Sequence, residues 1–305
     1  MKKTFTIKND SVKSRVDRWF RRFIGDVPQS FIEKNIRKGK IKVNNKKQKS
    51  SYKLKINDEI SIFNINIEPN KNKKKIRQYK PSKNEILSSS SFFLENNENF
   101  VVINKPSGIA VQSGTKSIRN ILDILKNRIE FKNSKPYAVH RIDKDTSGVL
   151  IVAKNRKYAQ LFTSLFRIRK IHKTYLCVVK GELNNKKGTL INDLIHYEND
   201  RKIITKAITH YTVISSNSGY SLIKLNPETG RKHQLRKQLL IHGHPIVGDN
   251  KYNFHLHKLS KKGTLMLHAY KLNFSINEIK YNFSVKPPLQ FEKFIKEKYL
   301  KISQL

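Results

Sequence analysis

The chain has 305 residues, a length that suits about two domains, and 37% of the residues are hydrophobic, which is enough material for a core. Its 63 Lys and Arg residues against 23 Asp and Glu residues give a formal net charge of +40. A surface with this charge attracts polyanions, so nucleic acid is the favoured partner class, although the codon bias of an AT-rich genome would supply part of the Lys excess.

Features that the sequence lacks disfavour several classes of protein. The single cysteine, Cys177, allows neither an intrachain disulfide nor a Cys-x-x-Cys metal knuckle. No apolar run approaches the roughly 18 residues of a membrane span, and residues 1–10 hold no apolar segment of the kind that a signal peptide requires. We therefore expect a soluble protein of the reducing cytoplasm, without a membrane partner.

Residues 10–65 form the first predicted unit, which begins with two helices. Apolar residues recur at the spacing of one helical stripe at Val16, Trp19, Phe20, Phe23 and Ile24. Ser14 is the expected N-cap of this helix, and Gly25 is its expected stop. A second helix is predicted from about Pro28 to Gly39.

A small basic sheet is predicted after these helices. Alternation over residues 40–43 indicates a strand, and Asn44-Asn45 indicates a turn. Further strands are marked by Leu54, Ile56, Ile60 and Ile62. Two helices followed by a basic sheet make a compact RNA-binding shape, although a solvated basic face is the ordinary alternative.

Two stretches of this unit, residues 15–19 and 36–44, resemble the S4 domain, an RNA-binding module of ribosomal proteins and RNA-modifying enzymes. The resemblance implies that basic residues of this unit contact RNA. These residues are Arg15, Arg18, Arg37, Lys38 and Lys40.

Residues 66–90 are predicted to be a basic linker, because a run of lysines and a run of serines bracket Pro81 and apolar anchors are few. Residues 91–305 form the second, larger unit. Strands are expected at residues 100–103, 149–153 and 175–179, and helices within residues 118–129, 158–166 and 232–241. Strands outnumber helices and connections are often hairpin-like, so the predicted fold class is α+β with a mixed or antiparallel sheet.

The densest group of polar residues is the loop 140–148, His-Arg-Ile-Asp-Lys-Asp-Thr-Ser-Gly, between two apolar strands. Such loops often carry functional residues, although an ordinary turn closed by Gly148 has the same composition. Asp143 and Asp145 also suggest a metal site or a glycosidase pair, but glycosidases usually draw their carboxylates from separate places. A zinc site lacks support too, because no spacing is specific among His233, His242, His244 and His268.

The same loop resembles the signature His-Arg-Leu-Asp-x-x-Thr-Ser-Gly of the RluA-type pseudouridine synthases, with Ile142 in place of Leu. Further matches follow the family's order: the turn 105–108, the Lys-x-Tyr at 173–175, the Thr-Gly-Arg-x-His-Gln-Leu/Ile-Arg block at 229–236, and the segment 243–249. The resemblance covers about residues 92–290. With an S4-like unit in front, the arrangement is most similar to the large-subunit ribosomal RNA pseudouridine synthase C group of this family.

The resemblance implies a role for each matched residue. Asp143 starts cleavage of the uridine N-glycosidic bond, as a nucleophile or by removing a ribose proton, and Tyr175 stacks on the flipped uracil. Arg236 pairs with Asp143 in bidentate form, and Arg141 fills the gap that the uridine leaves in the RNA. The other implied substrate- or RNA-binding residues are His140, Thr146 and Lys173.

The implied activity is the isomerisation of specific uridines to pseudouridine, in 23S ribosomal RNA, by base flipping, because a stacked uridine hides its glycosidic bond. An isomerisation needs no cofactor or metal, and we expect a monomer whose partner is RNA. Two alternatives remain: a non-catalytic RNA-binding or ribosome-assembly protein on a degenerate enzyme fold, and a synthase that acts on tRNA. The sequence leaves open which uridines are modified and whether Asp143 attacks carbon or removes a proton.

Overall fold

The structure is a computed structural model that describes residues 2–8, 11–25, 27–65, 79–114, 117–198, 201–252 and 263–301. The chain divides into two compact units, Met1–Ile76 and Arg77–Leu305, each with its own hydrophobic core. Among the helices in these ranges, none has the length and apolar character that a bilayer crossing demands.

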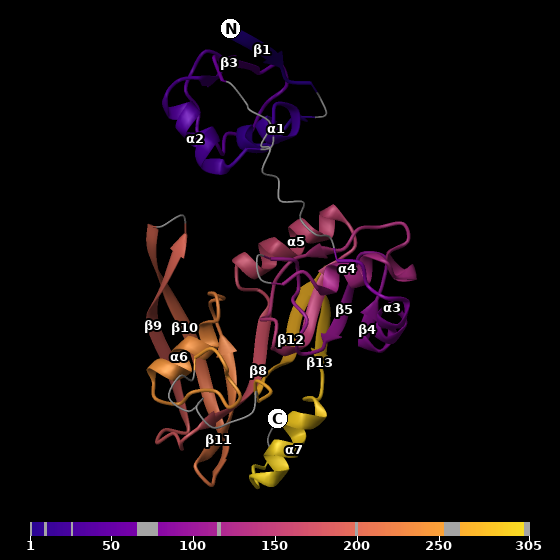
Figure 1. The fold of residues 1–305 in the computed structure, drawn as a ribbon, viewed down its shortest axis with the longest axis vertical. Helices are drawn as coiled ribbons and strands as arrows, with labels where there is room; N and C mark the ends of the chain where they lie inside the picture. Colours follow the sequence, from indigo (N-terminus) through magenta and orange to yellow (C-terminus); the bar gives the residue numbers. More distant parts are fainter. Residues whose placement is uncertain are drawn as a thin grey trace. The chain divides into compact units, whose positions relative to one another are not determined.

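The first unit packs two helices on a small antiparallel sheet (Figure 1). Its elements are β1 (Lys2–Thr6), α1 (Val16–Phe23), α2 (Gln29–Arg37), β2 (Ile41–Val43) and β3 (Glu59–Phe63). The sheet order is β1-β3-β2, and both pairings are antiparallel. Most of the predicted helical stripe is buried in this core, where Trp19 and Phe20 pack with residues of the second helix and the sheet, but Phe23 is 44% exposed.

The first unit differs from its prediction in three places. Its sheet includes β1, which precedes the predicted start at residue 10 and pairs with β3 along its whole length. The N-cap of α1 is Arg15, because the hydroxyl of Ser14 donates to the carbonyl of Ser11 at 2.6 Å instead of capping the helix. Leu54 is buried without belonging to a strand, and Ile56 is 54% exposed, so apolar character here marked core contacts and not strands.

The second unit is built on a ten-stranded sheet within its described residues. Its strands are β4 (Phe93–Asn96), β5 (Phe100–Lys105), β6 (Tyr137–Ala138), β7 (Ser147–Ala153), β8 (His172–Lys180), β9 (Lys187–Glu198), β10 (Arg201–Asn217), β11 (Tyr220–Pro227), β12 (Leu267–Ile276) and β13 (Ile279–Ser284). Its helices are α3 (Lys83–Ser88), α4 (Ile121–Lys126), α5 (Arg156–Arg167), α6 (Gln234–Ile241) and α7 (Leu289–Glu297), with short 3-10 turns at Ser89–Phe92 and Ile129–Phe131. The main path is β4-β5-β7-β12-β8-β11-β10-β9, and its pairings are antiparallel except between β7 and β12, which confirms the predicted mixed sheet.

Part of the range predicted as a linker is structured. Residues 66–78 of that range lie outside the described residues, but α3 and the following turn occupy residues 83–92. The Ser82 hydroxyl caps α3 by accepting the backbone N–H of Glu85, and Glu85 in turn binds Arg119 at 2.6 Å and the hydroxyl of Tyr79. The polar composition did not predict this short helix, because a side-chain cap and an ion pair stabilise it and no apolar stripe does.

Strand β7 is the centre of the core and is buried on both faces. Val149 and Ile151 face a cluster that includes α5, whereas Leu150 and Val152 face one that includes α4. This alternation explains why the strand reads as a continuous apolar run. The predicted helix at 118–129 is shorter than expected: α4 begins after Asn120, whose side chain accepts the N–H of Asp123 at 2.9 Å.

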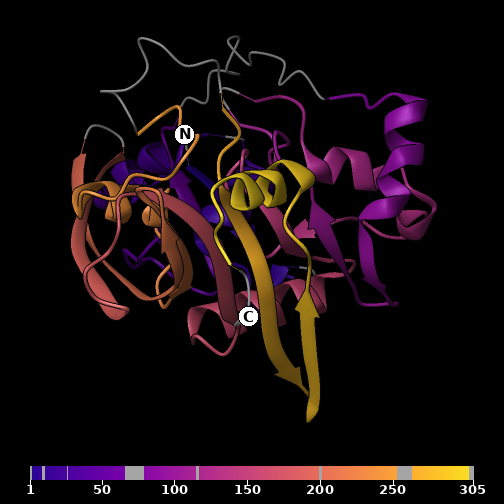
Figure 2. The same cartoon turned by 90° about the horizontal axis from the view of Figure 1, so that it is seen from below.

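The two halves of the sheet meet where β12 lies between β7 and β8. The parallel contact with β7 is short, and Gly148 makes it possible: a Cβ there, at φ +114°, would lie 2.2 Å from the carbonyl oxygen of Ala269. Beside it, the ring of His268 joins the Ser147 hydroxyl at 2.8 Å to the carbonyl of Val285 at 3.0 Å. These contacts fix the end of the polar loop, and β12 then continues into its long hairpin with β13 (Figure 2).

Candidate active site

A cavity of about 590 Å³ opens beside the junction of the two halves of the sheet. Most of its lining comes from four segments, residues 139–146, 163–167, 173–175 and 227–236. These are the polar loop before β7, the end of α5, the start of β8, and the connection from β11 into α6. The cavity therefore joins three of the sequence motifs that are far apart in the chain.

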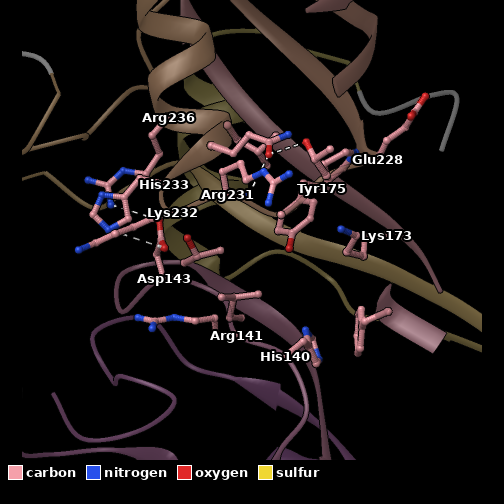
Figure 3. Close-up of a pocket in the computed structure, with 18 of the residues that line it drawn as sticks. His140, Arg141, Asp143, Lys173, Tyr175, Glu228, Arg231, Lys232, His233 and Arg236 are labelled. Atoms are coloured by element: carbon pink, nitrogen blue, oxygen red, sulfur yellow. Dashed lines mark hydrogen bonds and ion pairs between the residues drawn. The ribbon is translucent and has the colours of Figure 1, made fainter. Parts of the chain in front are cut away.

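Asp143 projects from the polar loop toward α6, with 21% of its side chain exposed (Figure 3). Its Oδ2 lies 3.4 Å from Nη1 of Arg236, and its Oδ1 lies 3.9 Å from Nε2 of His233. Both contacts are longer than a short charge-assisted hydrogen bond. The carboxylate thus faces two side-chain nitrogens, and only Arg236 is within hydrogen-bond distance of it.

Arg236 pairs with Asp143 as predicted, but through Nη1 alone, so the predicted bidentate form is wrong, and its bidentate pair is with Asp249. Nε and Nη2 each donate to an Asp249 carboxylate oxygen at 2.7 Å, and both side chains are buried. Burial works to raise the pKa of Asp249, but the hydrogen bonds from Arg236 and from the backbone N–H groups of Lys251 and Tyr252 outweigh it and leave that pKa below its usual range. Asp249 therefore fixes the guanidinium, and Nη1 is left facing Asp143.

Tyr175 and Lys173 lie on the same face of β8, two residues apart, and both line the cavity. Figure 3 shows Tyr175 between the Asp143 group and Lys173. Burial, reinforced by the negative charge of Asp143, raises the pKa of the Tyr175 phenol, so the ring carries a neutral hydroxyl. Burial also lowers the pKa of Lys173. The Tyr175 ring is half-buried and lines the same cavity as the Asp143 carboxylate.

Three neighbouring residues of the loop have different surroundings. Arg141 is exposed at the cavity. His140 is held by the protein: its Nε2 accepts the backbone N–H of Ile151 at 2.9 Å, and its ring stacks on Phe166 with centroids 4.5 Å apart. Burial lowers the pKa of His140 to about 3, so the acceptor nitrogen stays unprotonated. Thr146 is buried, and its hydroxyl has no hydrogen-bond partner among the described residues.

The block 229–236 is stiffened by a buried amide network. Gln234 accepts from the Thr229 hydroxyl at 2.8 Å and from the backbone N–H of Arg231 at 3.0 Å. Its amide nitrogen donates to the carbonyl of Ile208 and to the Thr209 hydroxyl. These bonds attach the start of α6 to β10, and they explain why this block needs Thr and Gln at these positions.

A buried lysine supports the polar loop from beneath. The ammonium of Lys105 donates to the carbonyls of Pro106, Ile109 and Lys144 at 2.7, 2.8 and 3.0 Å. Burial lowers the pKa of Lys105 to about 7. The Ser107 hydroxyl also donates to the carbonyl of Asp145 at 2.7 Å. The segment that the sequence presented as a turn is therefore a support for the loop that carries Asp143.

The alternative metal sites gain no support from the geometry. Within the described residues, no group of three or more His, Cys, Asp or Glu side chains is arranged to hold a metal ion. The four histidines considered for zinc have separate surroundings, and His268 is buried between Ser147 and Val285.

The basic residues predicted to bind RNA in the first unit do not belong to this cavity. Arg18, Arg37 and Lys38 are exposed there. Arg15 forms a bidentate pair with Asp17 at 3.1 and 2.6 Å, and Lys40 donates to the carbonyl of Asn64 at 3.2 Å.

Comparison with known proteins gives one consistent result. Residues 99–240 match the family model described as RNA pseudouridylate synthase. The "Ribosomal large subunit pseudouridine synthase C" of Buchnera aphidicola subsp. Baizongia pistaciae is 32% identical over 298 residues, which cover 93% of this chain and 93% of that protein. The chain belongs to the RNA pseudouridine synthase family.

Other members of the family extend this likeness. The protein of the same name from Rickettsia felis is 32% identical, over 94% of this chain and 98% of that one. The solved structure of human RNA pseudouridylate synthase domain containing 4 superposes with a TM-score of 0.61 at 28% identity, over 71% of this chain and 96% of that one. A second human member, domain containing 1, shares the fold with a TM-score of 0.56 at 22% identity.

Sequence reasoning missed three residues of this candidate site. Asp249 lay inside a matched segment, but nothing in its spacing from Arg236 revealed the buried pair between them. Lys105 also lay inside a matched turn, and its burial was invisible because lysine is rarely buried. His233 lay inside the matched block 229–236, but no role beside Asp143 was predicted for it, because its position there depends on the turn before α6.

Proposed function

We propose that this synthase isomerises specific uridines of large-subunit ribosomal RNA to pseudouridine, starting from Asp143. The observation that carries the proposal is that Asp143, Tyr175 and Arg236, which come from three separate motifs, line one cavity. The names of the relatives support the class of RNA. We propose that the synthase acts as a monomer in the cytoplasm.

The target uridine must leave its stack before its glycosidic bond can be reached. Tyr175 provides a half-buried ring on which the flipped uracil stacks, and such stacking contributes about 1–3 kcal/mol per base. Arg141 is exposed, planar and permanently charged, which suits it to occupy the vacated position in the RNA and to bind phosphate. The cavity volume of about 590 Å³ is ample for a flipped nucleotide.

The reaction replaces one bond between the ribose carbon C1′ and uracil with another. The bond from C1′ to N1 breaks, uracil turns, and a bond from C1′ to C5 forms, while the C5 proton is lost and N1 gains one. Reactant and product have the same atoms, so the protein must supply orientation and a reactive carboxylate. Asp143 suits this step because it faces two nitrogen donors and stays partly exposed to the cavity.

Two further cavity residues can bind the substrate. The Thr146 hydroxyl is buried and lacks a partner among the described residues, so a substrate atom that hydrogen-bonds to it would satisfy it. Lys173 lines the cavity beyond Tyr175 and offers a cation for phosphate. His140 already accepts a backbone N–H, and its role is to hold the loop that presents Arg141 and Asp143.

We propose that the first unit is an S4-like RNA-binding domain. Its two helices, its small sheet and its exposed Arg18, Arg37 and Lys38 support a surface for a large structured RNA. Arg15 and Lys40 already bind Asp17 and Asn64, so they contribute charge while keeping these local partners.

The test is a map of pseudouridines across the ribosomal and transfer RNAs of a strain that lacks this protein. Specific large-subunit positions should lose pseudouridine, and the intact gene should restore them, whereas an Asp143→Asn gene should not. Loss confined to tRNA would overturn the substrate class. An unchanged map, or restoration by the Asp143→Asn gene, would overturn the proposed activity of Asp143.

A further inference from the structure

His233 occupies a strained backbone position beside the cavity. It is the residue that precedes α6, and its backbone is left-handed, with φ 52° and ψ 33°. A non-glycine residue in this region is strained, and such positions cluster at functional sites. The strain places the imidazole between Asp143 on one side and Tyr252 on the other.

The imidazole is a neutral group with a defined tautomer. Burial lowers the pKa of His233 to about 4, although the charge of Asp143 opposes this shift, so the ring is unprotonated at neutral pH. Its Nδ1 lies 2.7 Å from the hydroxyl of Tyr252, whose own pKa burial raises. The phenol donates to Nδ1, because the opposite arrangement would turn the Nε2 lone pair toward a carboxylate. The proton therefore lies on Nε2, the nitrogen that faces Asp143.

One buried carboxylate fixes both donors that face Asp143. Asp249 holds Arg236 by two hydrogen bonds and accepts the backbone N–H of Tyr252 at 3.0 Å. The Tyr252 ring lies under the Arg236 guanidinium, with 5.1 Å from Cζ to the ring centroid. Asp249 thus holds both Arg236 and the Tyr252–His233 pair, and each of the two faces a different oxygen of Asp143.

We propose that His233 is a positioning residue, which donates its Nε2 hydrogen to Oδ1 of Asp143 when RNA closes the site and so directs the free lone pairs of the carboxylate toward the ribose. The inference rests on the proposed role of Asp143. A neutral donor suits this task, because a second full positive charge would further reduce the reactivity of the anion. The present separation of 3.9 Å is one that a small adjustment of the loop closes.

Two substitutions at position 233 separate this role from a purely structural one. His233→Gln places an amide N–H near the position of Nε2 and keeps the reach to Asp143. His233→Asn suits the left-handed backbone better but is too short to reach Asp143. A structural role predicts that the Asn variant is the more active of the two, and a positioning role predicts the reverse.

The measurement is the single-turnover rate of pseudouridine formation, with RNA affinity determined in parallel. We expect the Asn variant to lose about 10–100-fold in rate, as for one hydrogen bond to a charged group, while its RNA affinity stays within about threefold. The Gln variant should stay within about fivefold of the wild-type rate. Equal losses in the two variants, or a fully active Asn variant, would overturn the proposal.

Tyr252→Phe provides an independent test in which His233 is unchanged. The variant keeps the ring beneath Arg236 but removes the hydroxyl that fixes the tautomer, so the rate should fall about 3–10-fold at constant RNA affinity. An unchanged rate contradicts the inference even where a variant at 233 fails to fold. Asp143→Asn separates the two proposals. If Asp143→Asn is inactive and His233→Asn is fully active, only the role of His233 is overturned. If Asp143→Asn is active, the proposed function itself is overturned.

Discussion

Arg236 in the second unit and Arg15 in the first unit each form a bidentate pair with an aspartate, but the two pairs differ in burial. The side chains of Arg236 and Asp249 are 6% and 1% exposed, whereas those of Arg15 and Asp17 are 42% and 4% exposed. A buried pair gives its guanidinium one position and one orientation, at the cost of desolvation. A pair that reaches the surface leaves the cation open to water and to polyanions.

The difference extends to the other cations of the two regions. Lys105 and Arg236 are fixed by buried acceptors around the cavity, while Arg18, Arg37 and Lys38 are exposed in the first unit. Fixed charges suit local chemistry, which needs donors at defined positions. Exposed charges suit the attraction of RNA through its phosphates, which needs many cations and little geometry. One basic sequence thus contains two kinds of positive charge.

The largest expected effect follows from breaking the buried pair. Asp249→Asn leaves the Arg236 guanidinium buried without its anion and should lower the free energy of unfolding of the second unit by about 3–5 kcal/mol. The rate of pseudouridine formation should fall at least about 100-fold, because both donors to Asp143 lose their support. Chemical denaturation and single-turnover assays provide the two readouts.

Asp17→Asn is the matched control for that substitution, because it also removes the acid and leaves the arginine. The side chain of Arg15 is 42% exposed and stays hydrated without its anion, so the free energy of unfolding of the first unit should change by about 1 kcal/mol or less. Similar losses of stability in the two variants would show that burial does not distinguish the pairs.

A smaller effect is expected from the exposed cations of the first unit. Replacing Arg18, Arg37 and Lys38 with Gln removes three charges, so the slope of log affinity against log salt should decrease by about 2–3. The rate on a saturating short RNA should stay the same, because none of these residues lines the cavity. Filter binding over a salt series measures the slope. An unchanged slope would remove these residues from the RNA surface.

The last expected contrast is a difference in acid stability between the units. Burial lowers the pKa values of His140, His233 and His268 to about 3, 4 and 4, against 6.5 for a free imidazole. Below pH 6.5 the unfolded chain therefore binds more protons than the folded one. The second unit should lose stability as the pH falls from 6.5 to about 4 and keep it fully above 6.5, whereas the first unit contains no histidine and should change little over that range.

Calorimetry over a pH series measures this difference, and His268→Gln should reduce the slope for the second unit. An equal decline in both units would show that histidines are not its cause.

Much of the fold was visible in the sequence because apolar runs report burial. Val149 to Ala153 and Tyr175 to Val179 lie in β7 and β8, and the spacing in residues 158–166 belongs to α5. Strand β1 was not predicted because its residues are mostly exposed and two of them are lysines, and pairing with β3 holds it in place. Helix α3 was not predicted for a related reason, because a side-chain cap from Ser82 and the ion pair between Glu85 and Arg119 stabilise it.

The residues that share the candidate cavity could be predicted from the sequence, but their contacts could not. Motif matches brought Asp143, Tyr175 and Arg236 to one cavity. The bidentate partner of Arg236 depends on how the chain turns after α6, and no pattern of spacing encodes that turn. The stacking of His140 on Phe166 likewise depends on the packing of α5 against the loop.

The most direct test of the central claim compares Asp143→Asn with Asp145→Asn in single-turnover pseudouridine formation on one RNA. Asn at 143 keeps the shape of the side chain and removes the anion, so the rate should fall by more than about a thousandfold while RNA affinity stays within a few-fold. Asp145 is exposed and does not line the cavity, so its Asn variant should keep at least about a third of the wild-type rate. Comparable losses in both variants, or an active Asp143→Asn enzyme, would contradict the claim that Asp143 starts the reaction.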